Sequence, residues 1–180
     1  ASCADFAPLL LALGSRVTIA TPEGNREVPG NEFFGDHRKT ILMGGHVVAE
    51  ILVPARGGDE GAAYEAFGLR ATNFISVASA AARLRFDGEL CSEASLALGA
   101  VAPTPLLVRG ARELLVGKRA GEEDLAAAAA AAAEASAPIT DIRGSEEHRR
   151  ELVEELSLRV LRKARERAGA QEGEGRRARD

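Results

Sequence analysis

The dipeptide Asp87-Gly88 is the sequence feature that most constrains the fold of this chain. Both central residues of a two-residue β-hairpin turn need positive φ angles, and Asp-Gly adopts them readily. The segments on either side, residues 73–86 and 92–98, have the composition of strands. They predict an antiparallel pair, and residues 62–69 add a further extended segment ahead of it. The sequence therefore predicts a small antiparallel sheet in the middle of the chain.

Helices are predicted after this sheet, over residues 106–116, 122–136 and 145–167. The second contains eight consecutive alanines, and because alanine has the highest helix propensity, a close-packed helix is favoured over disorder. In the third, acidic residues come first and basic residues last, which complements the helix dipole. Residues 168–180 are polar and contain glycine, so we expect a disordered tail there.

The residues before the sheet predict a smaller unit. A helix begins near Asp5, since Pro8 fits only a first helical turn and leucines follow at near-helical spacing. Residues 16–20 and 26–28 are typical of a hairpin, and residues 47–53 form a strong strand. The front of the chain therefore combines one helix with antiparallel strands.

The segment ARGGDEG, residues 55–61, is the clearest linker in the sequence. It divides the chain into residues 1–57, residues 62–167 and the tail of residues 168–180. Both larger parts contain helices and antiparallel strands, so the predicted fold class is α+β.

Composition limits the classes of function. A chain of 180 residues with 46% hydrophobic residues can build a buried core. The net charge of -4 and the 4% of aromatic residues argue against a nucleic-acid partner, which needs basic or base-stacking surfaces. No apolar run approaches the ~20 residues that span a bilayer, and no basic segment leads into an apolar one at the start. We therefore expect a cytoplasmic protein without a membrane span.

Metal ligands with a recognisable spacing are missing from the sequence. Cys3 and Cys91 lie far apart, and the three histidines form no motif such as HExxH. Two reduced thiols and no protein-held metal are therefore expected. Any redox chemistry of this chain would need an organic cofactor.

Five stretches of the sequence together resemble one family. They are ASCADFAPLLLALGSRVTIATPEGNREVP, FFGDHRKT, VVAEILVP, GAVAPTP and ITDIRGSEEHRRELV. In this order and spacing they resemble the FAD-binding (medium) subunit of the molybdenum hydroxylases, the xanthine dehydrogenase and aerobic carbon monoxide dehydrogenase family. The resemblance implies the second half of a flavin-binding α+β domain in residues 1–57. The family's C-terminal domain, a small antiparallel sheet with three helices, would follow in residues 62–167.

The resemblance also implies a function. Such a subunit takes electrons from 2Fe–2S clusters on a small partner subunit, which a molybdopterin site on a large partner subunit supplies. It passes them through FAD to a final acceptor, so the chain would be an oxidoreductase subunit without catalytic residues of its own. The family's two glycine-rich FAD loops would precede residue 1, so the chain would bind FAD incompletely. The alternative is a truncated, non-catalytic docking module that no longer binds flavin.

Four cofactor-binding residues follow from the resemblance: Ala1, Ser2, Asp5 and Val48. Asp5 matches an acidic residue at the end of the second glycine loop, and its carboxylate offers several lone pairs to ribityl or ribose hydroxyls. The alternative for Asp5 is a plain helix N-cap. Val48 matches an aliphatic position that packs on the flavin, with a core strand residue as the alternative. Ala1 and Ser2 could touch the cofactor through their backbone.

Some positions depart from the family pattern or invite a second explanation. Glu65 stands where relatives commonly carry Lys or Arg near the flavin, and a negative charge there would oppose a reduced, anionic flavin. His37 replaces an aromatic residue before Arg38, which either faces the cofactor or a partner or belongs to a solvated face. Arg143 is expected to pair with Asp141 or to cap the alanine-rich helix.

Overall fold

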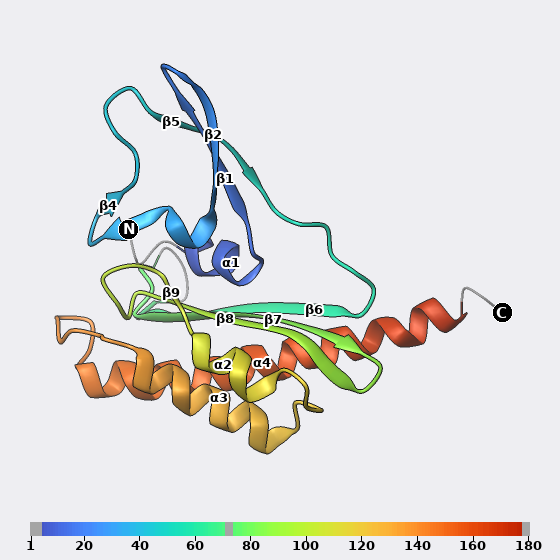
Figure 1. Cartoon of the computed structure of the whole chain (residues 1–180). Helices are drawn as coiled ribbons and strands as arrows, with labels where there is room; N and C mark the ends of the chain where they lie inside the picture. Colours follow the sequence, from blue (N-terminus) through green and yellow to red (C-terminus); the bar gives the residue numbers. More distant parts are fainter. Residues whose placement is uncertain (1–4, 71–73, 178–180) are drawn as a thin grey trace.

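The structure is a computed structural model that describes residues 5–70 and 74–177 and has two connected parts (Figure 1). The first part holds one short helix and two small sheets. The second holds a four-stranded antiparallel sheet and three helices. The predicted α+β fold class is therefore confirmed.

The first part is built around a three-stranded sheet. In chain order its elements are α1 (Phe6–Ala12), β1 (Arg16–Thr21), β2 (Gly24–Pro29), the 3-10 turn η1 (Gly30–Glu32), β3 (Phe34–Asp36), β4 (Lys39–Thr40) and β5 (Val47–Leu52). Strand β1 lies between β2 and β5 and is antiparallel to both, which confirms the predicted hairpin and third strand. Val17, Ile19 and Val28 form its small hydrophobic cluster.

The second part begins with the four-stranded sheet. Its elements are β6 (Glu60–Phe67), β7 (Ala78–Asp87), β8 (Leu90–Gly99), β9 (Leu106–Leu107), α2 (Arg109–Leu115), α3 (Glu122–Ala135) and α4 (Glu146–Arg177). The strands pair in sequence order, and every pair is antiparallel. The β7–β8 hairpin is confirmed, but its two turn residues are Gly88 and Glu89, because Asp87 still pairs with Leu90 as the last residue of β7. Gly88 has a φ of 58°, whereas the expected positive φ of Asp87 is wrong.

The three C-terminal helices cover one face of this sheet (Figure 1). The main hydrophobic core lies between them and joins Ala80, Ala82, Leu84, Leu96 and Leu98 of the strands to buried residues of all three helices. Small residues let the layers approach closely. A Cβ on Gly61 would overlap the carbonyl oxygen of Ala164, so α4 lies directly against the backbone of β6.

Helix α1 lies on the other face of the same sheet (Figure 1). Leu11 and Ala12 of α1 pack against Ala81 of β7 and Ala97 of β8, with Tyr64 at the edge of this smaller cluster. The alternation of side chains along each strand separates the two faces. The sheet therefore holds the C-terminal helices on one side and the front part of the chain on the other.

Two segments differ from the prediction. Leu106 and Leu107 pair with β8 as strand β9, and the helix starts only at Arg109, because the extended chain after Pro105 meets a free sheet edge. Helix α4 continues to Arg177, through part of the segment expected to be disordered. Alanine, glutamine, glutamate and arginine in that segment have high helix propensity, which offsets its glycines.

Candidate functional site

Asp5 immediately precedes α1, and its side chain does not cap the helix. Its backbone φ and ψ of -63° and -34° are already helical, and the carboxylate makes no capping hydrogen bond. Instead, Asp5 Oδ1 accepts a hydrogen bond of 2.6 Å from the Ser76 hydroxyl, which is 71 residues away in sequence. The N-cap alternative for Asp5 is therefore wrong. The carboxylate ties the front part of the chain to the segment that enters β7.

Tyr64 of β6 lies beside this pair. Burial and the negative charge of Asp5 together raise the pKa of Tyr64 to about 12. The hydroxyls of Ser76 and Ser79 lie close enough to act on it as well. Among the described residues, no neighbour meets the geometry of a hydrogen bond to the buried Tyr64 hydroxyl. Asp5 is exposed to solvent, whereas Ser76 and Ser79 are buried.

Helix α1 is seated on the sheet at Gly99. A Cβ on Gly99 would lie 2.5 Å from the Ser79 Oγ atom and 3.0 Å from the Cγ atom of Pro8. Only glycine allows Pro8, in the first turn of α1, to rest against β8 without displacing its neighbours. The start of α1, and with it Asp5, is therefore fixed by contacts with the second part of the chain.

Val48 lies in β5 opposite Ile19 of β1 and packs against the small cluster of the first sheet. It also lines a cavity of about 80 Å³ between α1 and that sheet, together with Ala7, Leu10, Leu11, Ser15, Val17, Gly30, Phe33, Phe34 and Ile51. Val48 therefore contacts the core and also faces an apolar hollow. Its role toward a flavin stays a prediction.

The other sequence-based candidates have different outcomes. Ala1 and Ser2 lie outside the described residues. Glu65 does not lie on the face of Asp5 and Tyr64: it forms ion pairs with Lys163 and, at 3.9 Å, with Arg159, both on α4. The alternation of β6 turns Glu65 toward the helices, where these cations neutralise its charge, and its effect on a flavin stays a prediction.

A cavity of about 570 Å³ lies beside Ser76. Both parts of the chain line it: His37 and Arg38 from the first, and Ser76, Ala100, Ala102, Pro103, Ala137, Pro138, Ile139, Asp141, Arg143 and Arg149 from the second. Three arginines and one aspartate give this lining an excess of positive charge. The sequence placed Arg38 on no particular surface, and only the fold brings it to this cavity.

Arg149 holds one wall of this cavity and is almost completely buried. Its Nη1 donates to the carbonyl oxygens of Val77 and Ala100, at 2.9 and 3.2 Å, and its Nη2 donates to Asp141 Oδ1 at 2.6 Å. Arg143 donates to the second oxygen of the same carboxylate, which confirms the predicted pair. Arg143 and Arg149 together hold the pKa of Asp141 well below its usual range.

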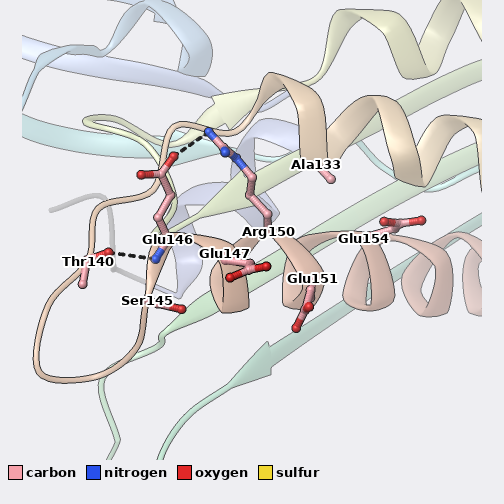
Figure 2. Close-up of a pocket in the computed structure, with 8 residues that line it drawn as sticks. All are labelled: Ala133, Thr140, Ser145, Glu146, Glu147, Arg150, Glu151 and Glu154. Atoms are coloured by element: carbon pink, nitrogen blue, oxygen red, sulfur yellow. Dashed lines mark hydrogen bonds and ion pairs between the residues drawn. The ribbon is translucent and has the colours of Figure 1, made fainter.

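A second hollow, of about 500 Å³, opens between the loop before α4 and the first turns of that helix (Figure 2). Glu146, Glu147, Glu151 and Glu154 line it, and Arg150 pairs with Glu146 at 2.7 Å. Figure 2 shows the carboxylates of Glu147, Glu151 and Glu154 spread along the first turns of α4. Such a surface repels an anionic cofactor, so it is a solvated helix face and no candidate for the flavin site.

Other kinds of site find no support in the part of the chain that the structure describes. No group of three or more His, Cys, Asp or Glu side chains there could hold a metal ion. Cys91 is buried and unpaired, and burial raises the pKa of its thiol to about 11. None of the described helices is both long and apolar enough to cross a membrane.

Comparison with known proteins matches both parts of the chain. Residues 62–164 match the CO dehydrogenase flavoprotein C-terminal domain, and residues 1–56 match the FAD binding domain in molybdopterin dehydrogenase. The chain belongs to the CO dehydrogenase flavoprotein family. The resemblance to the medium subunit of the molybdenum hydroxylases, stated from the sequence motifs, is therefore confirmed.

Individual relatives of this flavoprotein family agree. The chain is 34% identical to the carbon monoxide dehydrogenase medium chain of Hydrogenophaga pseudoflava, over 89% of this chain and 55% of the relative. It is 28% identical to the 6-hydroxypseudooxynicotine dehydrogenase complex subunit alpha of Paenarthrobacter nicotinovorans, and the match covers 93% of this chain and 56% of that relative. A solved structure of the Hydrogenophaga enzyme superposes with a TM-score of 0.89 at 32% identity. The superposition covers 92% of this chain and 57% of the chain in that structure. The chain thus spans little more than half the length of these relatives.

Sequence reasoning missed Tyr64 and Ser76. The strand period of two could have placed Tyr64 on the opposite face from Glu65, since the two are neighbours in β6. No local signal marks Ser76, because its partner Asp5 is distant in sequence. Both residues enter the site only when α1 packs on the sheet.

Proposed function

We propose that this chain is the FAD-binding, electron-transfer part of a molybdenum-containing hydroxylase or dehydrogenase. The observation that carries the proposal is the Asp5 carboxylate, which is exposed, does not cap its own helix, and is fixed by Ser76 where the two matched regions meet. An exposed carboxylate held in one orientation suits a ligand rich in hydroxyl groups, such as the ribityl chain of FAD.

The surroundings of Asp5 fit this cofactor. Arg143 and Arg149 of the cavity beside Ser76 are paired with Asp141, and Arg38 in the same lining is a further cation that suits the charge of a pyrophosphate. An aliphatic side chain such as that of Val48 suits contact with a flavin ring, but the hollow of about 80 Å³ that Val48 lines is too small to hold one. Asp5 and Val48 would contact the cofactor, and Ala1 and Ser2 would approach it through their backbone.

The chain's own residues bind and orient the cofactor in this proposal, and none of them performs bond chemistry. FAD itself supplies the ability to accept electrons singly and to deliver them in pairs. The electrons would come from an iron-sulfur small subunit and a molybdopterin large subunit, and a final acceptor would receive them. Substrate oxidation would take place on the large subunit. The match of residues 1–56 supports this function over a docking module without flavin.

Titration with FAD tests the proposal. We expect the folded chain to bind about one FAD and to change its fluorescence and visible absorbance. Asp5→Asn should weaken binding about tenfold or more, because hydrogen bonds to a charged group are lost. Asp87→Asn is the matched control, since it makes the same chemical change at an exposed residue, the last of β7. Absence of binding by a chain that circular dichroism shows to be folded would contradict the proposal.

A further inference from the structure

Four polar groups from four separate places in the sequence meet where α1 crosses the sheet. Asp5 comes from the start of α1, Tyr64 from β6, Ser76 from the segment before β7, and Ser79 from β7 itself. The surrounding contacts between α1 and the sheet are apolar and include Leu11 and Ala12 in the small cluster and Pro8 against Gly99. A cluster of this polarity on an otherwise apolar contact surface calls for an explanation.

The Asp5 carboxylate is held from one side. Ser76 is 1% exposed and donates to Oδ1 at 2.6 Å. The phenol of Tyr64 lies beside the same carboxylate, and its buried hydroxyl is without a hydrogen-bond partner among the described residues. A buried hydroxyl without a partner is costly, and among the described residues Asp5 is the charged acceptor that acts on it.

Ser76 is itself held by its neighbour in the chain. The Val77 N–H donates to the carbonyl oxygen of Phe67 at 2.8 Å, and the Val77 carbonyl oxygen accepts from Arg149 at 2.9 Å. The backbone that carries Ser76 is therefore fixed on both sides, by β6 and by α4. This makes the Ser76 hydroxyl a fixed donor, in contrast to a hydroxyl on a free loop.

We propose that Ser76 and Tyr64 are positioning residues, which hold the Asp5 carboxylate from the sheet side and leave its exposed side to the hydroxyl groups of FAD. This inference rests on the proposed function. It adds that half of the support for the cofactor's acidic ligand comes from the second part of the chain, which matches the C-terminal domain. Neither residue needs to touch the flavin.

The first test needs no cofactor. Tyr64 is the only tyrosine in the chain, and there is no tryptophan, so the absorbance of tyrosinate reports on this residue alone. At an alkaline pH where circular dichroism shows a folded chain, Asp5→Asn should increase the fraction of tyrosinate, because the charge that raises the pKa is gone. Asp87→Asn should leave it unchanged. An identical titration in all three proteins would overturn the proposal.

The second test measures the dissociation constant of FAD. Ser76→Ala and Tyr64→Phe should each weaken binding by about five- to tenfold, with Ser92→Ala on β8 as the matched control. In the Asp5→Asn background the same two changes should have little further effect, because they act through Asp5. A structural role alone would weaken binding equally in both backgrounds.

The outcomes separate the two proposals. If the unaltered chain binds FAD and Ser76→Ala and Tyr64→Phe bind equally well, the positioning role is wrong and the proposed function stands. If the unaltered, folded chain does not bind FAD, the proposed function fails and the positioning role fails with it. The tyrosinate titration then still decides whether Tyr64 and Asp5 are neighbours.

Discussion

The two faces of the β6–β9 sheet have opposite characters. The face under α2, α3 and α4 is closed by alanine, leucine and valine, and at Gly61 a helix backbone touches a strand backbone. The face under α1 has a smaller apolar cluster and carries Tyr64, Ser76 and Ser79. The comparison shows that the two faces of one sheet have different roles. One face stabilises the fold, and the other presents polar groups to the candidate flavin site.

The largest effect is expected on the helix-covered face. Gly61→Ala would place a Cβ against the Ala164 carbonyl oxygen, and because both are backbone-bound, α4 must move. We expect a loss of about 3 kcal/mol or more in the free energy of unfolding, measured by urea titration. Gly110→Ala in α2 is the control: its nearest neighbour would lie 3.8 Å away, so helix propensity should make it neutral or stabilising. Similar stabilities for both variants would refute the close contact.

The next largest effect is expected at the end of the sheet, where Arg149 of α4 donates to the carbonyl oxygens of Val77, just before β7, and Ala100, just after β8. Arg149→Met would leave the carbonyl oxygens of Val77 and Ala100 and one oxygen of Asp141 without this donor. We expect a loss of about 2–3 kcal/mol, measured by the same titration. Arg150→Met is the control, since Arg150 forms only a half-exposed pair with Glu146. If Arg149→Met were as mild as its control, the hydrogen bonds from α4 to the end of the sheet would be unimportant for stability.

Acid should weaken this link in a predictable way. Arg143 and Arg149 lower the pKa of Asp141 in the folded state, so its contribution is complete above the ordinary carboxyl pKa of about 4 and is lost as pH falls below it. Asp141→Asn should cost about 1–2 kcal/mol at neutral pH. The difference in unfolding free energy from the unaltered chain should shrink in acid. A difference that stays constant down to the lowest pH at which the chain folds would count against the pairing.

The smallest effect on stability, and the more specific one on function, is expected on the α1 face. Gly99→Ala would press on Pro8 and on the Ser79 hydroxyl, which can yield by a small shift. We expect a cost of about 1 kcal/mol, together with weaker FAD binding because Asp5 moves with α1. Gly35→Ala, with open space around its position, is the control. If Gly99→Ala lost stability but kept full FAD affinity, the packing of α1 at this position would not be needed for the candidate site.

Most of the fold could be predicted from the sequence because its signals are local. Asp87-Gly88 marked the hairpin, the alanine run marked α3, and the alternation of residues 16–20 marked β1. Strand β9 was missed because Leu106 and Leu107 become a strand only beside the free edge of β8. The motifs also identified the family without a structure, since their order and spacing are properties of the chain.

The candidate site was predicted less completely, because its contacts join residues far apart in sequence. The sequence determined that a carboxylate stands at the start of a short helix, and the strand period of two could have placed Tyr64 and Glu65 on opposite faces of a strand. Only the tertiary structure decided that Asp5 bonds to Ser76 and that Glu65 meets the cations of α4. The physical reason is packing. Local propensity determines where each helix and strand forms, whereas the packing of α1 against Gly99 determines which side chains of distant segments come into contact.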